Sequence, residues 1–309
     1  MSKPFHYTGV IPILATPFHD DESLDLESLS RLIQFNAAAG VDAVTILGLL
    51  GEANRLTDAD REKIIRTAIT ATKGLPVIVG TSHTGTAATI EHSRQALELG
   101  ATALMITASA QPTPSDKVVF DYFQHIAAKI SAPIVLQDHP AITGVHMPAD
   151  LILKLVREIP NIVSIKAESL PSPQKIGALK AAMATGRQAT ILTGLGGLYG
   201  FFDLERGSDG FNTGFAFPEV LLAIVREFRV KNVDAAYRIF ARYLPLLVFE
   251  QQPGVAIRKE ILRRRGLLTS NRVRHPGGSI DPGTTEQLSR LLRLTFGDAD
   301  LTRPLTVEA

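Results

Sequence analysis

The sequence predicts an α/β protein, a (β/α)8 TIM barrel with a C-terminal helical extension. Short apolar runs alternate with runs of helical spacing in roughly eight βα units over about 220 residues, which is the count and length of such a barrel. One of these runs, residues 162–168, is almost continuously apolar, as expected of a parallel strand covered on both faces. A doubly wound sheet is the competing architecture, but it usually has fewer strands per domain.

In the first half of the chain, each predicted strand is followed by a predicted helix. Asp25 can cap the first helix and Gly40 can end it. Thr57 and Asp60 form a capping-box pattern at the start of the second helix. A proline-containing loop, residues 108–114, precedes a helix that Ser115 opens. The four strands are residues 10–17, 43–47, 76–80 and 102–107, and the first three helices end near residues 39, 73 and 99.

The second half repeats this pattern and then changes to helices alone. Pro148 and Pro218 suit the first turns of two helices, and a further helix spans about residues 174–184. The strands are residues 133–137, 162–168, 189–193 and 210–213. After residue 230 three further helices are predicted, at 233–249, 255–265 and 284–294. Leu244-Pro245-Leu246 indicates a kink or break in the first of them. We therefore expect a barrel over residues 1–230 and a three-helix extension, 231–309, packed on it.

Composition excludes several classes of function. The formal net charge is +1, which gives no field for nucleic acid or an anionic membrane. Arg263-Arg264-Arg265 is interpreted as a solvated helix face. The chain has no cysteine, so disulfides, thiolate metal sites and cysteine nucleophiles are excluded. The start of the chain lacks the apolar run of a signal peptide, and no stretch approaches the roughly 20 apolar residues that span a bilayer. We expect a cytoplasmic protein.

Lys166 is the first candidate for a catalytic residue. Side chains alternate along a strand, so Ser164, Lys166 and Glu168 share one face of strand 162–168. A buried amine must be neutral or covalently occupied, and a neutral amine can attack a carbonyl to form an imine. The simpler interpretation is a strand-end lysine that reaches water. Glu168 favours the ammonium form, so it must point away, be neutral, or act as acid or base once the imine has formed.

Other polar and glycine-rich segments follow the predicted strands. His83 and His139 could each transfer protons, although a hydrogen-bonded structural histidine fits both positions equally well. Asp138 beside His139 does not make a metal pair, because adjacent side chains on a strand diverge. We therefore predict no metal site. Gly194-Leu195-Gly196-Gly197 is interpreted as room for substrate, and Glu52 as a residue that organises its loop.

At this point the residues resemble a known family. Gly48-Leu49-Leu50-Gly51-Glu52 resembles the GxxGE loop of the dihydrodipicolinate synthase / N-acetylneuraminate lyase family, and Lys166 falls where that family has its imine-forming lysine. The resemblance covers essentially the whole chain. It implies that backbone N–H groups of Leu49 and Leu50, in the loop that Gly48 opens, hold the carboxylate of pyruvate or another 2-oxo acid. It also implies that Asn212 faces this ligand and that the protein is a homotetramer built from dimers.

The sequence departs from the synthases of this family at four positions. Their proton relay uses a threonine and two tyrosines, which correspond to Leu49, Gln137 and Ala110 here, and their substrate-gripping arginine corresponds to Ile142. A glutamine amide can orient substrate or water but cannot shuttle a proton at neutral pH. These departures argue against synthesis of dihydrodipicolinate.

Three local features instead resemble the 2-keto-3-deoxyarabonate dehydratase branch of the family. They are Thr81-Ser82-His83, Gln137-Asp138-His139-Pro140 and a glutamate two residues after the lysine, Glu168. The glycines of the Gly48 loop are instead those of the aldolase-like members.

We therefore predict a class I lyase, an aldolase or dehydratase without cofactor or metal, that acts on a small 2-oxo acid through a Lys166 imine. His83, His139 or Glu168 would supply the proton transfers, and Gln137 would orient the substrate. The alternatives are a catalytically impaired 2-oxo-acid binding protein, a true dihydrodipicolinate synthase, and a metal-dependent aldolase or sugar-phosphate isomerase on the same barrel.

Overall fold

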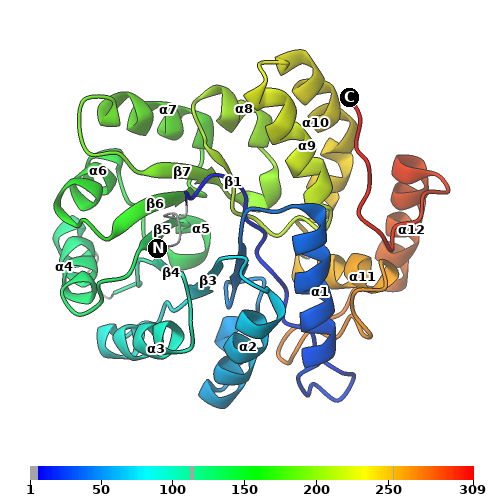
Figure 1. The fold of residues 1–309 in the computed structure, drawn as a ribbon, viewed down its shortest axis with the longest axis horizontal. Helices are drawn as coiled ribbons and strands as arrows, with labels where there is room; N and C mark the ends of the chain where they lie inside the picture. The colour runs from blue at the N-terminus through cyan, green and yellow to red at the C-terminus, as the bar shows by residue number, and fades with distance from the viewer. Residues whose placement is uncertain (1–5, 112–114, 253) are drawn as a thin grey trace.

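The chain folds into a (β/α)8 TIM barrel, with helices around a central ring of strands (Figure 1). The computed structural model describes residues 6–111, 115–252 and 254–309. The first five residues of the chain, and residues 112–114 of the predicted proline-containing loop, lie outside this part. Within it the strands form one parallel sheet in the order β1-β8-β7-β6-β5-β4-β3-β2. The sheet closes because Val10, Pro12 and Leu14 exchange backbone hydrogen bonds of 2.8–2.9 Å with Asp42 and Thr45.

The strands and the barrel helices alternate as the sequence predicts. The strands are β1 Gly9–Val10, β2 Val44–Ile46, β3 Val77–Gly80, β4 Ala103–Thr107, β5 Ile134–Asp138, β6 Ile162–Ala167, β7 Thr190–Thr193 and β8 Gly210–Phe211. The barrel helices are α1 Leu26–Ala39, α2 Asp58–Ala71, α3 Thr86–Glu98, α4 Asp116–Ala127, α5 Pro140–Thr143, α6 Ala149–Glu158, α7 Ser172–Met183, α8 Gly200–Glu205 and α9 Pro218–Arg229.

The predicted helix caps are present in the structure. Asp25 accepts a hydrogen bond from the backbone N–H of Ser28, and Gly40 ends α1 in the left-handed conformation, with φ of +88°. Thr57 and Asp60 form a reciprocal capping box at the start of α2. Such caps depend on residues three or four positions apart, so the sequence alone specifies them.

The first and last strands are shorter than predicted. The predicted strand over residues 10–17 is reduced to β1 and an isolated bridge between Ile13 and Thr45. Pro12 has no N–H to donate, which interrupts regular pairing there. The predicted strand over 210–213 is reduced to β8. The short helix α5, which begins at Pro140, was not predicted.

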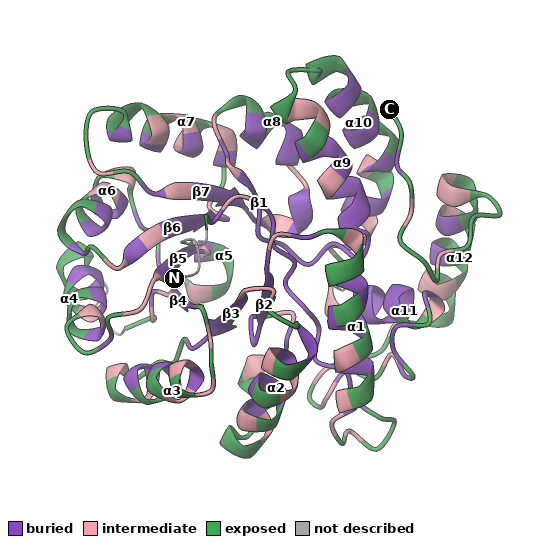
Figure 2. Cartoon of the chain, in the orientation of Figure 1, coloured by how far each residue is buried: buried purple, intermediate pink, exposed green. Residues whose placement is uncertain are grey.

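Two clusters make up the apolar core. The larger one lies between the strands and the surrounding helices, and the smaller one fills the barrel interior with Ile11, Ile78, Met105, Val135 and Leu192 among others. Figure 2 shows the strands buried and the outer faces of the barrel helices exposed. A packed interior leaves only the strand ends free to hold a ligand.

The remaining helices are α10 Val233–Phe249, α11 Val255–Arg264 and α12 Pro282–Phe296, which lie beside α9 and α1 (Figure 1). Helix α10 runs through Pro245, so the predicted interruption does not end it. The arginine run is only partly a solvated face, because Arg265 is fully buried whereas Arg263 is 43% exposed. Among the described residues, no helix is both long enough and apolar enough to span a membrane.

Candidate active site

Lys166 lies at the carboxyl end of β6, and its side chain is 6% exposed. In the sheet register it is paired with Gln137 on β5 and with Leu192 on β7. Because residues at the same level of neighbouring parallel strands point to the same side, Lys166 and Gln137 lie next to each other within the barrel mouth. The lysine therefore does not reach bulk water, and its Nζ lies 3.2 Å from Oε2 of Glu168.

Glu168 links three elements around the lysine. Its Oε2 also accepts a hydrogen bond of 2.6 Å from Nε2 of Gln137, and its Oε1 accepts one of 3.2 Å from the backbone N–H of Leu195. Burial by itself would raise the pKa of Glu168, but the charge of Lys166, a nearby His139 and these hydrogen bonds hold that pKa below its usual value. Of the three alternatives left open by the sequence, pointing away is wrong, because Glu168 contacts Lys166, and the lowered pKa favours the ionised over the neutral carboxyl.

His139 and Asp138 occupy the end of the neighbouring strand, β5. His139 Nε2 lies 4.0 Å from Glu168 Oε1, and its Nδ1 has no partner among the described residues. Burial lowers the pKa of His139, with Glu168 opposing and Lys166 adding to this shift, so the imidazole is neutral at pH 7. Asp138 points to a different partner, Lys175, at 2.6 Å. The two adjacent side chains diverge, as the sequence predicts.

The loop of residues 48–52, which follows β2, is stabilised by hydrogen bonds within its own backbone. The N–H groups of Gly51 and Glu52 donate to the carbonyls of Gly48 and Leu49, each at 3.0 Å. Within the described residues, the N–H groups of Leu49 and Leu50 have no acceptor. They are therefore free to bind an anion, as two successive amide donors do in anion-binding loops.

Asn212 closes the barrel beside this loop. Its Nδ2 donates to the carbonyl of Ile11 at 2.9 Å and to Oγ1 of Thr45 at 3.0 Å, so it joins β8 to β1 and β2. Its Oδ1 has no partner in the described part of the chain. The side chain is completely buried, and its observed contacts are those of a residue that supports the barrel.

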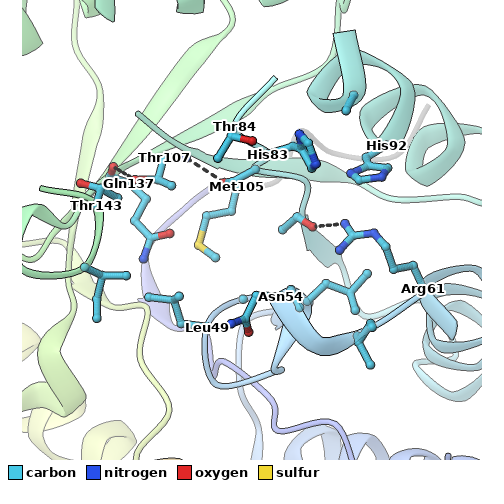
Figure 3. A pocket seen from close by; sticks show the side chains of 18 of the residues that line it. Leu49, Asn54, Arg61, His83, Thr84, His92, Met105, Thr107, Gln137 and Thr143 are labelled. Atoms are coloured by element: carbon cyan, nitrogen blue, oxygen red, sulfur yellow. Dashed lines mark hydrogen bonds between the residues drawn. The ribbon is translucent and has the colours of Figure 1, made fainter. Parts of the chain in front are cut away.

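A cavity of about 560 Å³ opens at this end of the barrel. Figure 3 shows Gln137 and Thr107 at one end of it and Arg61 with His92 at the other. Arg61 donates to the carbonyl of Gly80 at 2.8 Å, and burial is the main cause of a lowered pKa of His92, although Asp58 opposes it. The cavity wall is thus apolar near Met105 and polar and ionisable at the end formed by Arg61 and His92.

The structure brings five of the predicted site residues to this cavity and leaves four away from its wall. The residues that line it are Gly48, Leu49, His83, Gln137 and His139. The other four are Lys166, Glu168, Leu50 and Asn212, and of these Glu168 accepts a hydrogen bond from Gln137. His83 is exposed, and its Nδ1 accepts a 2.9 Å hydrogen bond from the N–H of Gly85. The side chain of Leu50 does not line the cavity, because it packs against Gly214.

Sequence reasoning missed several residues of the cavity wall. Arg61 and His92 lie on the helices α2 and α3 rather than at strand ends, so a search of strand ends did not find them. The positions where the synthases carry tyrosines and an arginine offer no such groups here, and Ile142 is 59% exposed at the cavity. No group of three or more His, Asp or Glu in the described residues is arranged to hold a metal ion.

The fold and the site together define a TIM barrel with a lysine–carboxylate pair at the end of its sixth strand and free backbone donors at the end of its second. A model of the dihydrodipicolinate synthetase family matches residues 6–295, and the chain belongs to this family. Membership makes it a lyase of that family.

Individual relatives have different names within the family. The chain is 31% identical over 304 residues to the L-2-keto-3-deoxyarabonate dehydratase of Azospirillum brasilense, covering 94% of this chain and 95% of that one. It is 34% identical over 267 residues to the 4-hydroxy-tetrahydrodipicolinate synthase of Chlorobium luteolum, covering 84% and 88%.

Solved structures show the same fold. The dihydrodipicolinate synthase of Rhodopseudomonas palustris matches with a TM-score of 0.89 and 36% identity, over 94% of this chain and 98% of that one. The prophage protein YagE of E. coli K12, solved in complex with pyruvate, matches with a TM-score of 0.86 and 29% identity, again over 94% and 98%.

Proposed function

We propose that the protein is a Schiff-base lyase that dehydrates a 2-keto-3-deoxy sugar acid. The observation that carries the proposal is the buried contact of 3.2 Å between Lys166 Nζ and the carboxylate of Glu168. A carboxylate at this distance can take a proton from the ammonium and free the amine for attack on a ketone. This pair differs from the buried pairs Lys259–Glu52 and Arg265–Glu219 in its position at the carboxyl end of a barrel strand, where the active sites of such barrels lie.

The reaction then uses the same two residues at each step. The Lys166 amine adds to the C2 ketone, and loss of water gives a cationic imine beside the Glu168 carboxylate. That imine acidifies C3, and Glu168 takes the C3 proton to leave an enamine. The enamine expels the C4 hydroxyl, which leaves as water with the proton from Glu168. Hydrolysis of the unsaturated imine restores the amine. The released unsaturated alcohol then tautomerises, its C5–H and O–H protons moving to C3 and C4, and this gives a 5-oxo product that is a semialdehyde when the substrate has five carbons.

A base near C3 favours dehydration over aldol cleavage. C3 is one bond from the imine carbon, so a carboxylate near Nζ is well placed for the C3 proton. Dehydration removes that proton and retro-aldol cleavage does not, whereas both reactions need a proton-transfer group at the C4 hydroxyl. The 31% identity with a 2-keto-3-deoxyarabonate dehydratase over 94% of the chain supports the same choice. The polar side chains that line the cavity, His83, Thr107 and Thr143 among them, suit a hydroxylated substrate chain.

Synthesis of dihydrodipicolinate is less well supported. Gln137 donates its amide to Glu168 and cannot relay a proton. Ile142 has no charge with which to grip a second substrate. A homo-oligomeric state and a 2-oxo-acid ligand held by Leu49 and Leu50 stay part of this proposal.

The proposal is tested with five- and six-carbon 2-keto-3-deoxy sugar acids. We expect sodium borohydride to trap a covalent adduct in the wild type, seen by mass spectrometry, and none in Lys166→Ala. Glu168→Gln should keep the adduct but lower kcat by ~10²–10⁴, because it loses a proton-transfer group. A semialdehyde product identifies dehydration, and pyruvate identifies an aldolase instead. An adduct without turnover on any substrate would indicate a binding protein, and no adduct at all would refute imine chemistry.

A further inference from the structure

The carboxylate of Glu52 connects the loop of residues 48–52 to the C-terminal extension. Glu52 is buried, and both of its oxygens are occupied. Its Oε1 forms an ion pair with Nζ of Lys259, on α11. Its Oε2 accepts hydrogen bonds from Arg55 Nη1 at 2.8 Å and from the backbone N–H of Arg274 at 2.9 Å. Two of its three partners thus come from residues more than 200 positions away in the chain.

The ammonium group of Lys259 is buried beside the Glu52 carboxylate. Its side chain is 0% exposed, and it donates also to the carbonyl of Arg272 at 2.7 Å. The centroid of the Phe18 ring lies 4.4 Å from Lys259 Nζ and 4.4 Å from Arg274 Cζ. Taking an ammonium out of water is costly, and such a pair is kept only where its geometry is well satisfied. Burial lowers the pKa of Lys259 to about 8, and the Glu52 charge opposes this shift.

Glu52 itself sits in a strained backbone position. Its φ is +53°, a left-handed conformation that a residue with a Cβ adopts only when its surroundings fix it. Its N–H bonds to the carbonyl of Leu49, so the peptide groups of Leu49 and Glu52 are coupled. Thr16 adds a 2.6 Å hydrogen bond from Oγ1 to the carbonyl of Gly51. The Leu49 carbonyl shares a peptide group with the N–H of Leu50, and the Gly48 carbonyl that Gly51 holds shares one with the N–H of Leu49, so the position of residues 51 and 52 sets the directions of both free N–H groups.

We infer that Lys259 is a positioning residue for the substrate carboxylate: through Glu52 it fixes the loop whose Leu49 and Leu50 N–H groups receive that anion. The inference rests on the proposed function, in which a 2-oxo acid binds there. The helical extension therefore takes part in substrate binding without touching the substrate.

The first test separates binding from chemistry. Lys259→Met removes the charge at similar volume, so the loop loses its anchor while Lys166 and Glu168 stay in place. We expect KM for the 2-keto-3-deoxy sugar acid to rise ~10–100-fold with kcat nearly unchanged, because small misplacement of a binding group has effects of this size. Lys259→Arg should recover much of the loss. Glu52→Gln should reproduce the KM change, and the double variant should add nothing further.

Arg187→Met is the matched control. Arg187 is another cation held by main-chain carbonyls, including that of Ile162 at 3.0 Å, but it lies at the opposite end of the barrel. The Arg187→Met substitution should lower the melting temperature and leave KM for the sugar acid unchanged. An equal KM in Lys259→Met and the wild type would overturn the inference.

A second readout does not need turnover. Calorimetry measures non-covalent pyruvate binding to Lys166→Ala and to Lys166→Ala/Lys259→Met, and we expect at least ~10-fold weaker binding in the latter. Equal affinities, or no pyruvate binding in either variant, would refute the role of Lys259. The calorimetric test of Lys259 applies even if the wild type turns over no sugar acid. Lack of turnover would count against the proposed function alone. If Lys259→Met does not fold, Glu52→Gln replaces it in both measurements.

Discussion

Glu168 and Asp203 are both buried carboxylates, and their surroundings shift their pKa values in opposite directions. Burial opposes ionisation in each case. Lys166 and hydrogen-bond donors outweigh burial at Glu168, whereas Asp203 has only hydroxyl partners, such as Ser172 Oγ at 2.8 Å, and its Oδ2 has no partner among the described residues. Burial therefore raises the pKa of Asp203 to about 6. The two buried carboxylates thus differ because Glu168 has a nearby cation and amide donors, whereas Asp203 has hydroxyl donors alone.

Asp203 makes the stability of the protein fall as pH rises. Its folded-state pKa is raised above the ordinary aspartate value of 3.8, so the folded state binds the proton more tightly than the unfolded state. The stabilising contribution is complete below pH 3.8 and is lost as pH rises through about 6. Asp203→Asn should thus be more stable than the wild type at pH 7.5, by about 3 kcal/mol at most, and this difference should shrink at pH 4.5. Urea unfolding at both pH values measures this. A difference independent of pH would show that Asp203 does not titrate as stated.

At the scale of single residues, the sequence predicts which side chains reach the barrel mouth but not what they contact. Strand alternation places Lys166 and Glu168 on one face, and that follows from local geometry. The approach of Glu168 to Gln137 and Leu195 depends on the register of β5, β6 and β7, which brings together residues about 30 positions apart. A single sequence does not contain that register.

Among the elements, ends set by local capping are predictable and ends set by tertiary packing are not. The caps of α1 and α2 come directly from Asp25 and Thr57. In contrast, α10 continues through Pro245 although proline removes a backbone donor and disfavours a helix interior. Tyr243, Leu246 and Leu247 are buried on either side of it. Packing of this face keeps the helix continuous, since most helical stability in proteins comes from such contacts.

The loop after β7 brings Gly194 against Glu168, the carboxylate of the proposed proton transfer. A Cβ built on Gly194 would lie 2.1 Å from Glu168 Cγ, so the buried Glu168 side chain would have to shift to make room for it. Gly194→Ala should therefore push Glu168 from Lys166 and Gln137, and lower kcat by ~10²-fold or more, because the proton-transfer group is displaced. Turnover and borohydride trapping measure the two effects separately.

Gly186→Ala serves as the control for that substitution. A Cβ at Gly186 would meet no heavy atom within 4 Å, so turnover should not change. If Gly194→Ala turned over substrate as fast as the wild type, either Glu168 would have room to move or its position would not matter for the reaction.

At the scale of the whole molecule, the barrel and the C-terminal extension are consecutive in the chain but pack into one shared interior. Arg265, just after α11, is fully buried and pairs through Nη2 with Oε1 of Glu219 on α9 at 2.5 Å. Its guanidinium carbon lies 4.6 Å from the ring centroid of Phe35 and 4.4 Å from that of Phe217. It also donates to the carbonyl of Leu301 at 2.9 Å, near the C-terminus. The division at residue 230 is thus one of chain order, and we propose that both parts unfold together.

Substitution of Arg265 tests this shared interior. Arg265→Met leaves the Glu219 carboxylate buried without its cation, so the free energy of unfolding should fall by about 3–5 kcal/mol in a single transition. Arg265→Met/Glu219→Gln should recover part of the loss, because no charge is then left unpaired. Arg263→Met, which removes an exposed partner of Glu260, should cost less than about 1 kcal/mol. Circular dichroism in urea measures all three, since the chain has no tryptophan to report by fluorescence. Two separated transitions in Arg265→Met would show that the barrel keeps its fold when the extension is lost, and that Arg265 joins two independent units.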